Sequence, residues 1–404
     1  MIKYNFDEVV NRRNSNAAKV DETYTKFGRE GLIPMWIADM DYKTAQPIID
    51  ALSRRVEQGV FGYTSRPDEY YEAVSNWQNK LNNWNPDVKC MSFALGVLPM
   101  LSNIFHVFLS EGDKVIIQPP VFQEFKPVIE CWGGIAVNNP LVERDGDYKM
   151  NLVELDRLAS EGAKFMILCH PHNPLGRVWT KEELEDVGRI CLKHNVMVIS
   201  DEIYSDLTLF GNIHIPFASI SEEIAKNTIT CTSVSKTFNL SGLQVATAVL
   251  PNIEMKEAYD KILYKNQTYR NSACNVVANT VAMNECEDWY KQVIQYIEGN
   301  VKFACDFINN NIPKIKATIP QATYLIWADC RELNMSGEEL NDFMLDEAGL
   351  ALNDGRIFGI GGEGFVRLNA GCSRIVLEEA LNQLKTAIEK HISNKNQDKF
   401  MSFS

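Results

Sequence analysis

Between residues 90 and 250 the chain alternates short apolar runs with longer amphipathic segments. The apolar runs are rich in β-branched residues, which is typical of strands buried on both faces. They lie at 114–120, 133–137, 164–171, 196–202, 228–233 and 246–250. Residues 180–195 have apolar residues at helical spacing behind Thr180 and Glu183, the pattern of a capping box. The alternation predicts an α/β fold, with a mainly parallel sheet covered by helices.

After about residue 250 the pattern becomes helical and more polar, and strand-like runs return beyond residue 315 in TYLIWADC and FVRLNAGC. This change predicts a second, smaller α+β domain, which the N-terminal residues complete as a split domain. We expect a large domain at 46–290, a small domain from 1–45 and 291–395, and a flexible tail at 396–404.

Composition excludes several classes of function. The chain has 404 residues, a formal charge of −13 and a hydrophobic fraction of 45%. A nucleic-acid or membrane surface needs clustered basic residues, so we expect neither partner. The N-terminus has no secretory signal pattern, and no apolar run is long enough to span a membrane. The ten cysteines are scattered without a C-x-x-C pair, and the six histidines form no H-E-x-x-H motif. We therefore expect free thiols, a cytoplasmic location and no metal site.

Polar side chains follow several of the predicted strands, at the points where the strands end. These residues are Asn173, Asp201, Ser233 and Lys236. Ligands of parallel α/β sheets bind beyond the carboxyl ends of the strands. We therefore expect these side chains to gather at one ligand site.

Lys236 lies in TCTSVSKTFNLSGLQ, between two apolar strands. The hydroxyls of Ser233 and Ser235, with the backbone N–H groups of the turn, would form a phosphate cradle beside an amine. A lysine used for covalent chemistry must be partly desolvated so that its amine is neutral. The local alternative is an ordinary solvent-exposed loop lysine.

Two other segments have the same ambiguity. Asp201 could keep a ligand's ring nitrogen protonated, with the phenol of Tyr204 in the same site, or it could simply begin a helix as its N-cap. Asn173 lies in the rigid turn HNPLG, where its side chain could bind a ligand or its own backbone.

Taken together, these segments resemble the fold-type I pyridoxal-phosphate enzymes of the aminotransferase class I and II superfamily. The similarity covers nearly the whole chain and is greatest to the carbon–sulfur β-lyase branch, which includes cystathionine β-lyases and cysteine desulfhydrases. The segments that resemble this branch are MWIADMDY, GVFGYT, GVLPML, PPVFQEF, HNPLGRVWT, SDEIYSDL, SKTFNLSGLQ and FVRLNAGCSR, in this order.

The resemblance implies a role for each matching residue. Lys236 would bind pyridoxal 5′-phosphate covalently and then move protons on the substrate, assisted by Tyr204. Asp201 would pair with the ring nitrogen, because the ring accepts electrons only while that nitrogen is protonated. Arg367 would bind the substrate carboxylate. The remaining cofactor contacts would be Asn173 and Tyr204 at the ring hydroxyl, Phe122 at the ring face, Val97, Leu98, Ser233 and Ser235 at the phosphate, and Tyr63 at the phosphate of a neighbouring subunit in a homodimer.

The implied reaction is β-elimination of L-cystathionine, a related cysteine conjugate or L-cysteine, which yields a thiol or sulfide, pyruvate and ammonia. Three positions depart from the lyase pattern. Tyr204 replaces the usual histidine and favours an aminotransferase, whereas Gln244 replaces an arginine that many aminotransferases use for phosphate. Phe122 replaces a tyrosine. An aminotransferase is therefore the first alternative function, and a binding or regulatory role on the same fold is the second.

Overall fold

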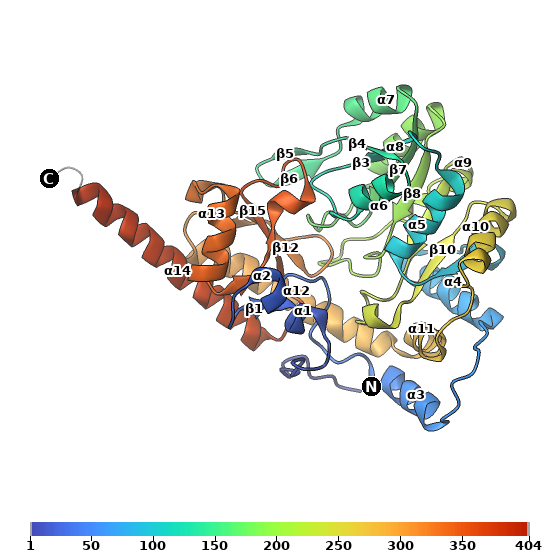
Figure 1. Ribbon diagram of the computed structural model, residues 1–404, viewed down its shortest axis with the longest axis horizontal. Helices are drawn as coiled ribbons and strands as arrows, with labels where there is room; N and C mark the ends of the chain where they lie inside the picture. The colour runs from blue at the N-terminus through green and yellow to red at the C-terminus, as the bar shows by residue number, and fades with distance from the viewer. Residues whose placement is uncertain (1, 402–404) are drawn as a thin grey trace.

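The computed structural model describes residues 2–401, and its larger sheet has seven strands in the order β2-β10-β9-β8-β7-β3-β4 (Figure 1). Only β10 runs antiparallel to its neighbours β2 and β9. The predicted α/β fold with a mainly parallel sheet is therefore confirmed. The strands are β2 (Met91–Ala94), β3 (Lys114–Ile117), β4 (Ile135–Asn138), β7 (Ala163–Cys169), β8 (Met197–Asp201), β9 (Thr228–Thr232) and β10 (Ala246–Val249).

Helices cover both faces of this sheet because both faces are apolar. Ile167 and Ile199 pack with residues of α5, α6 and α10, whereas Met166 and Val198 pack with residues of α7, α8 and α9. The capping box of Thr180 and Glu183 starts α8 as the sequence predicted. The bounds are α5 (Val97–Phe108), α6 (Phe125–Cys131), α7 (Leu152–Ser160), α8 (Lys181–Lys193), α9 (Glu222–Lys226) and α10 (Ile253–Lys265).

The register of the central strands sets the position of the polar strand ends. Asp201 pairs with Cys169 of β7 on one side and with Cys231 of β9 on the other. The last residue of β8 therefore lies between two neighbouring strand ends, at the carboxyl edge of the sheet.

A second, antiparallel sheet has the order β11-β12-β15-β14. The N-terminal strand β1 (Ile33–Pro34) pairs with β13 (Leu350–Ala351), so the first residues of the chain lie beside its last third, as a split domain requires. The predicted boundaries at 45/46 and 290/291 stay a prediction, and the second falls inside α12 (Glu287–Asn311). The strands are β11 (Lys316–Ala317), β12 (Leu325–Asp329), β14 (Asn353–Asp354) and β15 (Phe365–Asn369).

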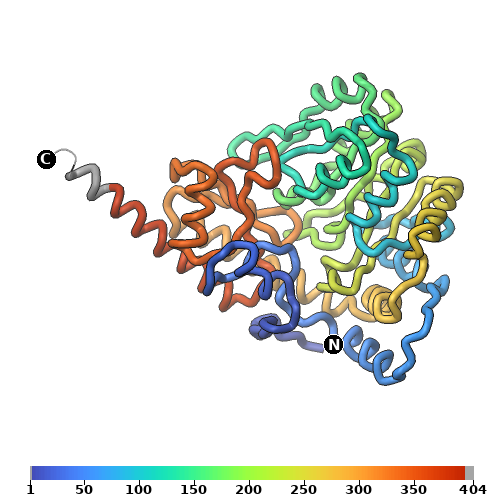
Figure 2. Tube along the Cα trace, viewed as in Figure 1, coloured from blue at the N-terminus to red at the C-terminus, as the bar shows by residue number. Residues whose placement is uncertain are grey.

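The remaining elements complete the periphery. They are α1 (Ala18–Asp21), α2 (Thr23–Phe27), α3 (Gln46–Glu57), α4 (Asp68–Asn82), α11 (Ala273–Glu285), α13 (Gly337–Asp342), α14 (Arg374–Met401) and the hairpin of β5 (Val142–Arg144) and β6 (Asp147–Lys149). Helix α14 extends away from the body of the molecule (Figures 1 and 2). It continues through 396–401, which the sequence predicted as a tail, because no proline or glycine interrupts it; 402–404 lie outside the described residues. Over residues 2–401, no helix is long and apolar enough to cross a membrane.

Candidate active site

A cavity of about 240 Å³ lies at the carboxyl edge of the larger sheet. Its walls come from the segment before α3, the first turn of α5, the ends of β7 and β8, and the turn after β9. The lining residues are Ala38, Leu95, Gly96, Val97, Leu98, Pro99, Phe122, Cys169, Asn173, Asp201, Ile203, Tyr204, Ser235, Lys236, Ser241, Gln244 and Val245.

Lys236 is half-buried, and its amine lies between Ala38, in the segment before α3, and Ser241 of its own turn. The amine donates hydrogen bonds to the carbonyl of Ala38 at 2.7 Å and to the hydroxyl of Ser241 at 3.4 Å. Burial lowers the pKa of Lys236 to about 8, although the nearby Asp39 raises it. The alternative of an exposed loop lysine is therefore wrong, and the amine is more easily neutral than in water.

Asp201 is the buried carboxylate of the cavity, with 5% of its surface exposed. Its Oδ1 accepts a hydrogen bond from the backbone N–H of Ile203 at 3.2 Å. Burial raises the pKa of Asp201 to about 7, and the charge of Glu202 adds to this effect. Residues 202–216 form turns and no helix, so the alternative of a helix N-cap does not hold. An anion desolvated in this way attracts a cationic partner.

Arg367 of β15 is buried behind Asn173. Its Nη1 donates to Oδ1 of Asn173 at 2.9 Å, and its Nη2 donates to the carbonyl of Trp36 at 2.8 Å and to Oδ1 of Asn353 at 2.6 Å. Because Oδ1 of Asn173 accepts from Arg367, the Asn173 amide N–H₂ is left to donate to a ligand. The Nε of Arg367 has no partner among the described residues, so the guanidinium retains a donor for a carboxylate.

The first turn of α5, which lines the cavity, offers hydrogen-bond donors suited to an anion. Helix α5 begins at Val97 after Gly96, and the first N–H groups of a helix have no partner within it. The helix dipole adds a partial positive charge there. Pro99 has no N–H, so Gly96, Val97 and Leu98 supply the available backbone donors, beside the hydroxyl of Ser235.

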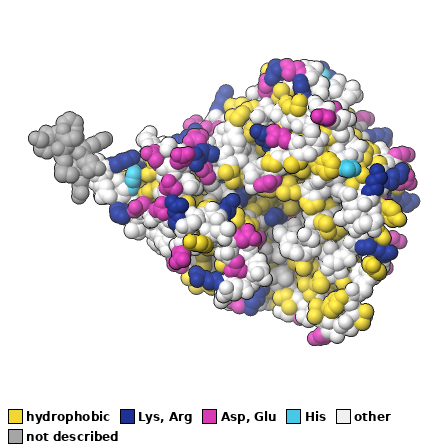
Figure 3. All heavy atoms as spheres, in the orientation of Figure 1, with side chains coloured by type: hydrophobic (Ala, Val, Ile, Leu, Met, Phe, Trp, Pro, Cys, Tyr) yellow, Lys and Arg dark blue, Asp and Glu magenta, His cyan; other side chains and the backbone are white. Residues whose placement is uncertain are grey.

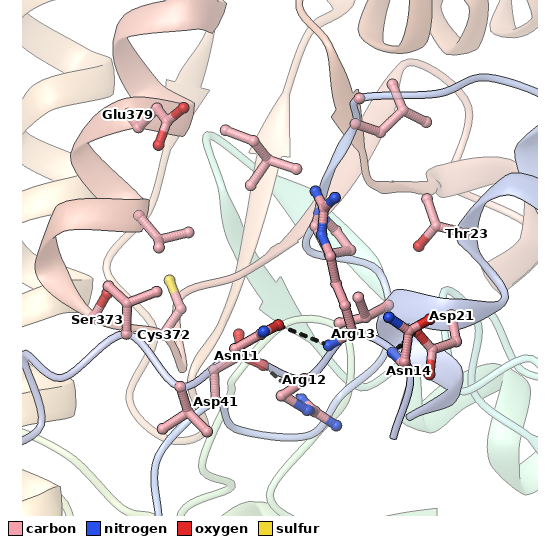
Figure 4. Close-up of a pocket in the computed structure, with 18 of the residues that line it drawn as sticks. Asn11, Arg12, Arg13, Asn14, Asp21, Thr23, Asp41, Cys372, Ser373 and Glu379 are labelled. Atoms are coloured by element: carbon pink, nitrogen blue, oxygen red, sulfur yellow. Dashed lines mark hydrogen bonds and ion pairs between the residues drawn. The ribbon is translucent and has the colours of Figure 1, made fainter. Parts of the chain in front are cut away.

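The segment from Trp36 to Asp41, here called the strap, contributes Ala38 to the wall of the cavity. Tyr324 joins Lys236 in donating to the carbonyl of Ala38, at 3.0 Å. The strap is held from the other side by two cations: Arg12 binds Asp39 and Asp41, and the buried Lys19 lies 2.8 Å from Asp41. Figure 4 shows Arg12 and Asp41 beside a separate hollow between the N-terminal segment and the start of α14. The strap therefore belongs to the site although it lies far from Lys236 in sequence.

A comparison with known protein families assigns the chain to one of them. Residues 31–384 match the model of the family described as aminotransferase class I and II. The chain belongs to this family. The resemblance found in the sequence is thereby confirmed.

Individual members of the family are similar over nearly the whole chain. Cystathionine beta-lyase PatB of Bacillus subtilis is 38% identical, over 95% of this chain and 100% of the relative. A PLP-bound putative aminotransferase of Clostridium difficile matches with a TM-score of 0.94 and 43% identity, over 96% of this chain and 100% of its own. Cystalysin of Treponema denticola, which contains pyridoxal 5′-phosphate, matches with a TM-score of 0.92 and 32% identity, over 96% and 100%.

Eight residues that the sequence singled out line the cavity of this class I and II family member: Val97, Leu98, Phe122, Asn173, Asp201, Tyr204, Ser235 and Lys236. Three others do not line it. Ser233 is buried below Ser235 and its hydroxyl bonds within the turn, at 2.8 Å from the Ser235 hydroxyl. Arg367 is joined to the cavity wall by its hydrogen bond to Asn173. Tyr63 lies on the surface of the molecule, with 95% of its own surface exposed.

The sequence analysis matched MWIADMDY and SKTFNLSGLQ to the family but assigned no site role to the strap or to the hydroxyl of Ser241. The two aspartates of the strap, Asp39 and Asp41, are visible in IADMDY, but their cationic partners lie about 20 to 30 positions earlier in the chain. A contact of that kind leaves no local pattern. The available signals were the family resemblance of MWIADMDY and its two acidic residues in an otherwise apolar run.

Proposed function

We infer that the chain is a pyridoxal-phosphate-dependent carbon–sulfur lyase, which breaks the C–S bond of a sulfur amino acid by β-elimination. The sequence prediction of this enzyme class is confirmed by similarity to cystathionine beta-lyase PatB and to cystalysin. The single observation that carries the assignment in this chain is the cavity that places the amine of Lys236 with the buried carboxylate of Asp201.

The donor set fits pyridoxal phosphate. The first turn of α5 and Ser235 offer hydrogen-bond donors to a phosphate at one end, and Asp201 offers a desolvated carboxylate to a ring nitrogen at the other. Lys236 provides the amine between them, and Phe122 provides an apolar face for the ring. We propose that Asn173 and Tyr204 hold the ring hydroxyl.

The chain's own residues then perform the proton transfers. Bound pyridoxal phosphate supplies an acceptor for the electrons of the substrate α-carbon while its ring nitrogen is protonated. Asp201 holds that proton. Arg367 binds and orients the substrate carboxylate through its guanidinium. The Nζ of Lys236 would take the α-proton of the bound substrate, and the thiolate would leave from the β-carbon. Hydrolysis of the eliminated product yields pyruvate and ammonia.

We propose L-cystathionine as the substrate, with L-cysteine and other cysteine S-conjugates as members of the same class. The proposal is supported by the names of two similar proteins, the cystathionine beta-lyases of Bacillus subtilis and Corynebacterium glutamicum. The test is product analysis with purified, cofactor-loaded protein and no keto acid present. Sustained, equimolar release of free thiol, pyruvate and ammonia from L-cystathionine is the expected result. Release of none of the three would overturn the proposed substrate and reaction.

The second candidate is transamination on the same fold, which Tyr204 favours. Its phenol is buried in the cavity, where the lyase pattern has an imidazole. The same experiment separates the two reactions. An aminotransferase would release nothing until an acceptor keto acid is added, and a new amino acid would then form.

We further propose a homodimer with shared active sites, in which Tyr63 reaches the phosphate site of the second copy. The proposal is supported by a group of exposed apolar side chains in the last turn of α3 and just after it: Val56, Val60, Phe61 and Tyr63 are 53%, 66%, 66% and 95% exposed. Figure 3 shows hydrophobic side chains over this end of the molecule. The guanidinium of Arg270 lies 5.9 Å from the Tyr63 ring and would accompany it. Sedimentation of the wild type and a Tyr63→Ala variant tests the assembly.

We also propose that the enzyme works in the cytoplasm. All ten cysteines lie in the described part of the chain and are free thiols. Seven of them are buried, where they act as small apolar residues. This pattern suits a reducing compartment. Fractionation of cells that express the protein would test the location.

A further inference from the structure

A buried group of titratable residues lies directly behind Asp201 and takes no part in the reaction described above. It consists of Glu202, His170 and His214, which are 1%, 0% and 2% exposed. Asp201, the last residue of β8, lines the cavity, whereas Glu202, His170 and His214 do not.

Glu202 is surrounded by donors. Its Oε1 accepts hydrogen bonds from the hydroxyl of Ser200 at 2.7 Å and from the backbone N–H of Phe217 at 3.0 Å, and its Oε2 lies 2.9 Å from Nε2 of His214. A backbone N–H group can only donate, so Oε1 accepts from both Phe217 and Ser200 and carries no proton. These two donors favour the ionised form of Glu202, whereas its burial opposes that form.

The two histidines do not neutralise this charge. His170 and His214 lie with ring centroids 4.4 Å apart, so they cannot both be charged at low cost. Nε2 of His170 lies 3.1 Å from the carbonyl of Ile215, which only accepts, so Nε2 carries the single proton of the neutral ring. Burial lowers the pKa of both rings to about 3.

Two backbone bonds fix the position of this charge relative to Asp201. The N–H of His170 donates to the carbonyl of Asp201, and the N–H of Glu202 donates to the carbonyl of Cys231, each at 2.9 Å. The end of β8 is thereby tied to both neighbouring strands. The charged and titratable groups around Glu202 are Asp201, His170, His214 and Cys231, with Arg177 beyond His170 and Lys236 beyond Asp201.

We propose that Glu202 is a positioning residue for the reaction: its buried negative charge, one residue from Asp201, holds the proton between Asp201 and the cofactor's ring nitrogen. The proposal rests on the role of Asp201 proposed above. The protonated ring nitrogen is a cation beside Asp201. If it lost its proton, the negative charges of Asp201 and Glu202 would repel each other with no cation beside them, so the charge of Glu202 makes that loss less favourable. Burial raises the pKa of Glu202 to about 7, so the charge is present above that pH and lost below it.

The test uses the full-length protein loaded with pyridoxal phosphate whose ring nitrogen carries an NMR-active isotope. The chemical shift of that nitrogen reports its protonation over a pH series, independently of turnover. Glu202→Gln keeps the shape and removes the charge, and it should lower the protonation midpoint by about one pH unit, which is tenfold weaker proton binding. Glu202→Asp keeps the charge and should retain the wild-type midpoint. Glu222→Gln, on the surface, should change nothing.

The outcomes separate this inference from the assignment of Asp201. If Asp201→Asn lowers the midpoint and Glu202→Gln does not, the role of Glu202 is overturned and that of Asp201 stands. If Asp201→Asn leaves the midpoint unchanged, the assignment of Asp201 itself fails. Equal shifts in Glu202→Gln and Glu202→Asp would indicate a packing effect and also overturn the proposal. Should Glu202→Gln not fold, Ser200→Ala removes one donor to the carboxylate and should move the midpoint in the same direction; no shift would count against the proposal.

Discussion

The amine of Lys236 donates a hydrogen bond to the backbone carbonyl of Ala38, 2.7 Å away, although the two residues are 198 positions apart in the chain. The carbonyl of Trp36, two residues before Ala38, accepts from Arg367 in the same way. One short segment near the N-terminus thus contacts both the proposed base and the proposed carboxylate-binding residue. Its position will affect substrate binding as well as proton transfer.

Replacement of Lys236 by alanine should abolish the reaction. The variant loses both the covalent attachment of the cofactor and the group that moves the α-proton, and a positioned acid–base group alone contributes about 100- to 10,000-fold to a rate. The visible absorbance of the bound cofactor and the release of pyruvate are measured together. A variant that keeps normal turnover would contradict the assignment of Lys236.

The cofactor-free protein should become more stable as the pH rises from about 8 towards 10.5, the two pKa values of Lys236 in the folded and unfolded chain. In this window the unfolded state binds the extra proton, so the free energy of unfolding rises with pH. Denaturant unfolding of the wild type and of Lys236→Met measures the effect. The free energy of unfolding of the wild type, taken relative to that of Lys236→Met, should rise across the window. A constant difference in this free energy would refute the lowered pKa.

Arg367→Lys should weaken substrate binding more than cofactor binding. A lysine ammonium cannot reproduce the planar fork of the guanidinium, which contacts Asn173, Trp36 and Asn353 and retains one free donor. Loss of one charge-assisted bond costs about 1.5–3 kcal/mol, so KM should rise by roughly 10- to 100-fold. Steady-state kinetics measure KM, and titration measures cofactor affinity. A KM equal to that of the wild type would remove Arg367 from the substrate site.

Lys19→Met should destabilise the N-terminal segment. Lys19 is 1% exposed and lies 2.8 Å from Asp41, which then keeps only Arg12 as a partner. Removal of a hydrogen bond to a charged group costs roughly 1.5–3 kcal/mol. Lys3→Met is the control, because the Lys3 side chain is exposed. Denaturant unfolding measures both, and equal stabilities would show that the ion pair contributes nothing.

Gly176→Ala should be much more harmful than Gly211→Ala. Both glycines have a left-handed backbone, with φ of 65° and 76°, so alanine is strained by about 1–2 kcal/mol at either position. Only at Gly176 would a Cβ also lie 2.3 Å from the Cβ of Pro320. The turn after Asn173 would then have to move away from the second sheet. Unfolding of the two variants should differ by at least about 1 kcal/mol, and equal losses would contradict the close approach.

The α/β fold could be predicted from sequence because strand burial leaves a local pattern. The runs at 164–171, 196–202 and 228–233 became β7, β8 and β9, since strands buried on both faces are continuously apolar. The capping box of Thr180 and Glu183 was equally local. The polar residues at the strand ends followed from the rule that ligands bind at that edge.

The tertiary structure alone decided how distant segments complete the site. The bond from Lys236 to Ala38, the contact of Arg367 with Asn173, and the separation of Ser233 from the cavity depend on packing between elements that are remote in the chain. The raised pKa of Asp201 likewise comes from burial, which a sequence does not measure. Residue types and their order determined the family and the chemistry available to this protein. Three-dimensional proximity and desolvation decided which side chains meet and in which protonation state, because both depend on the whole folded chain.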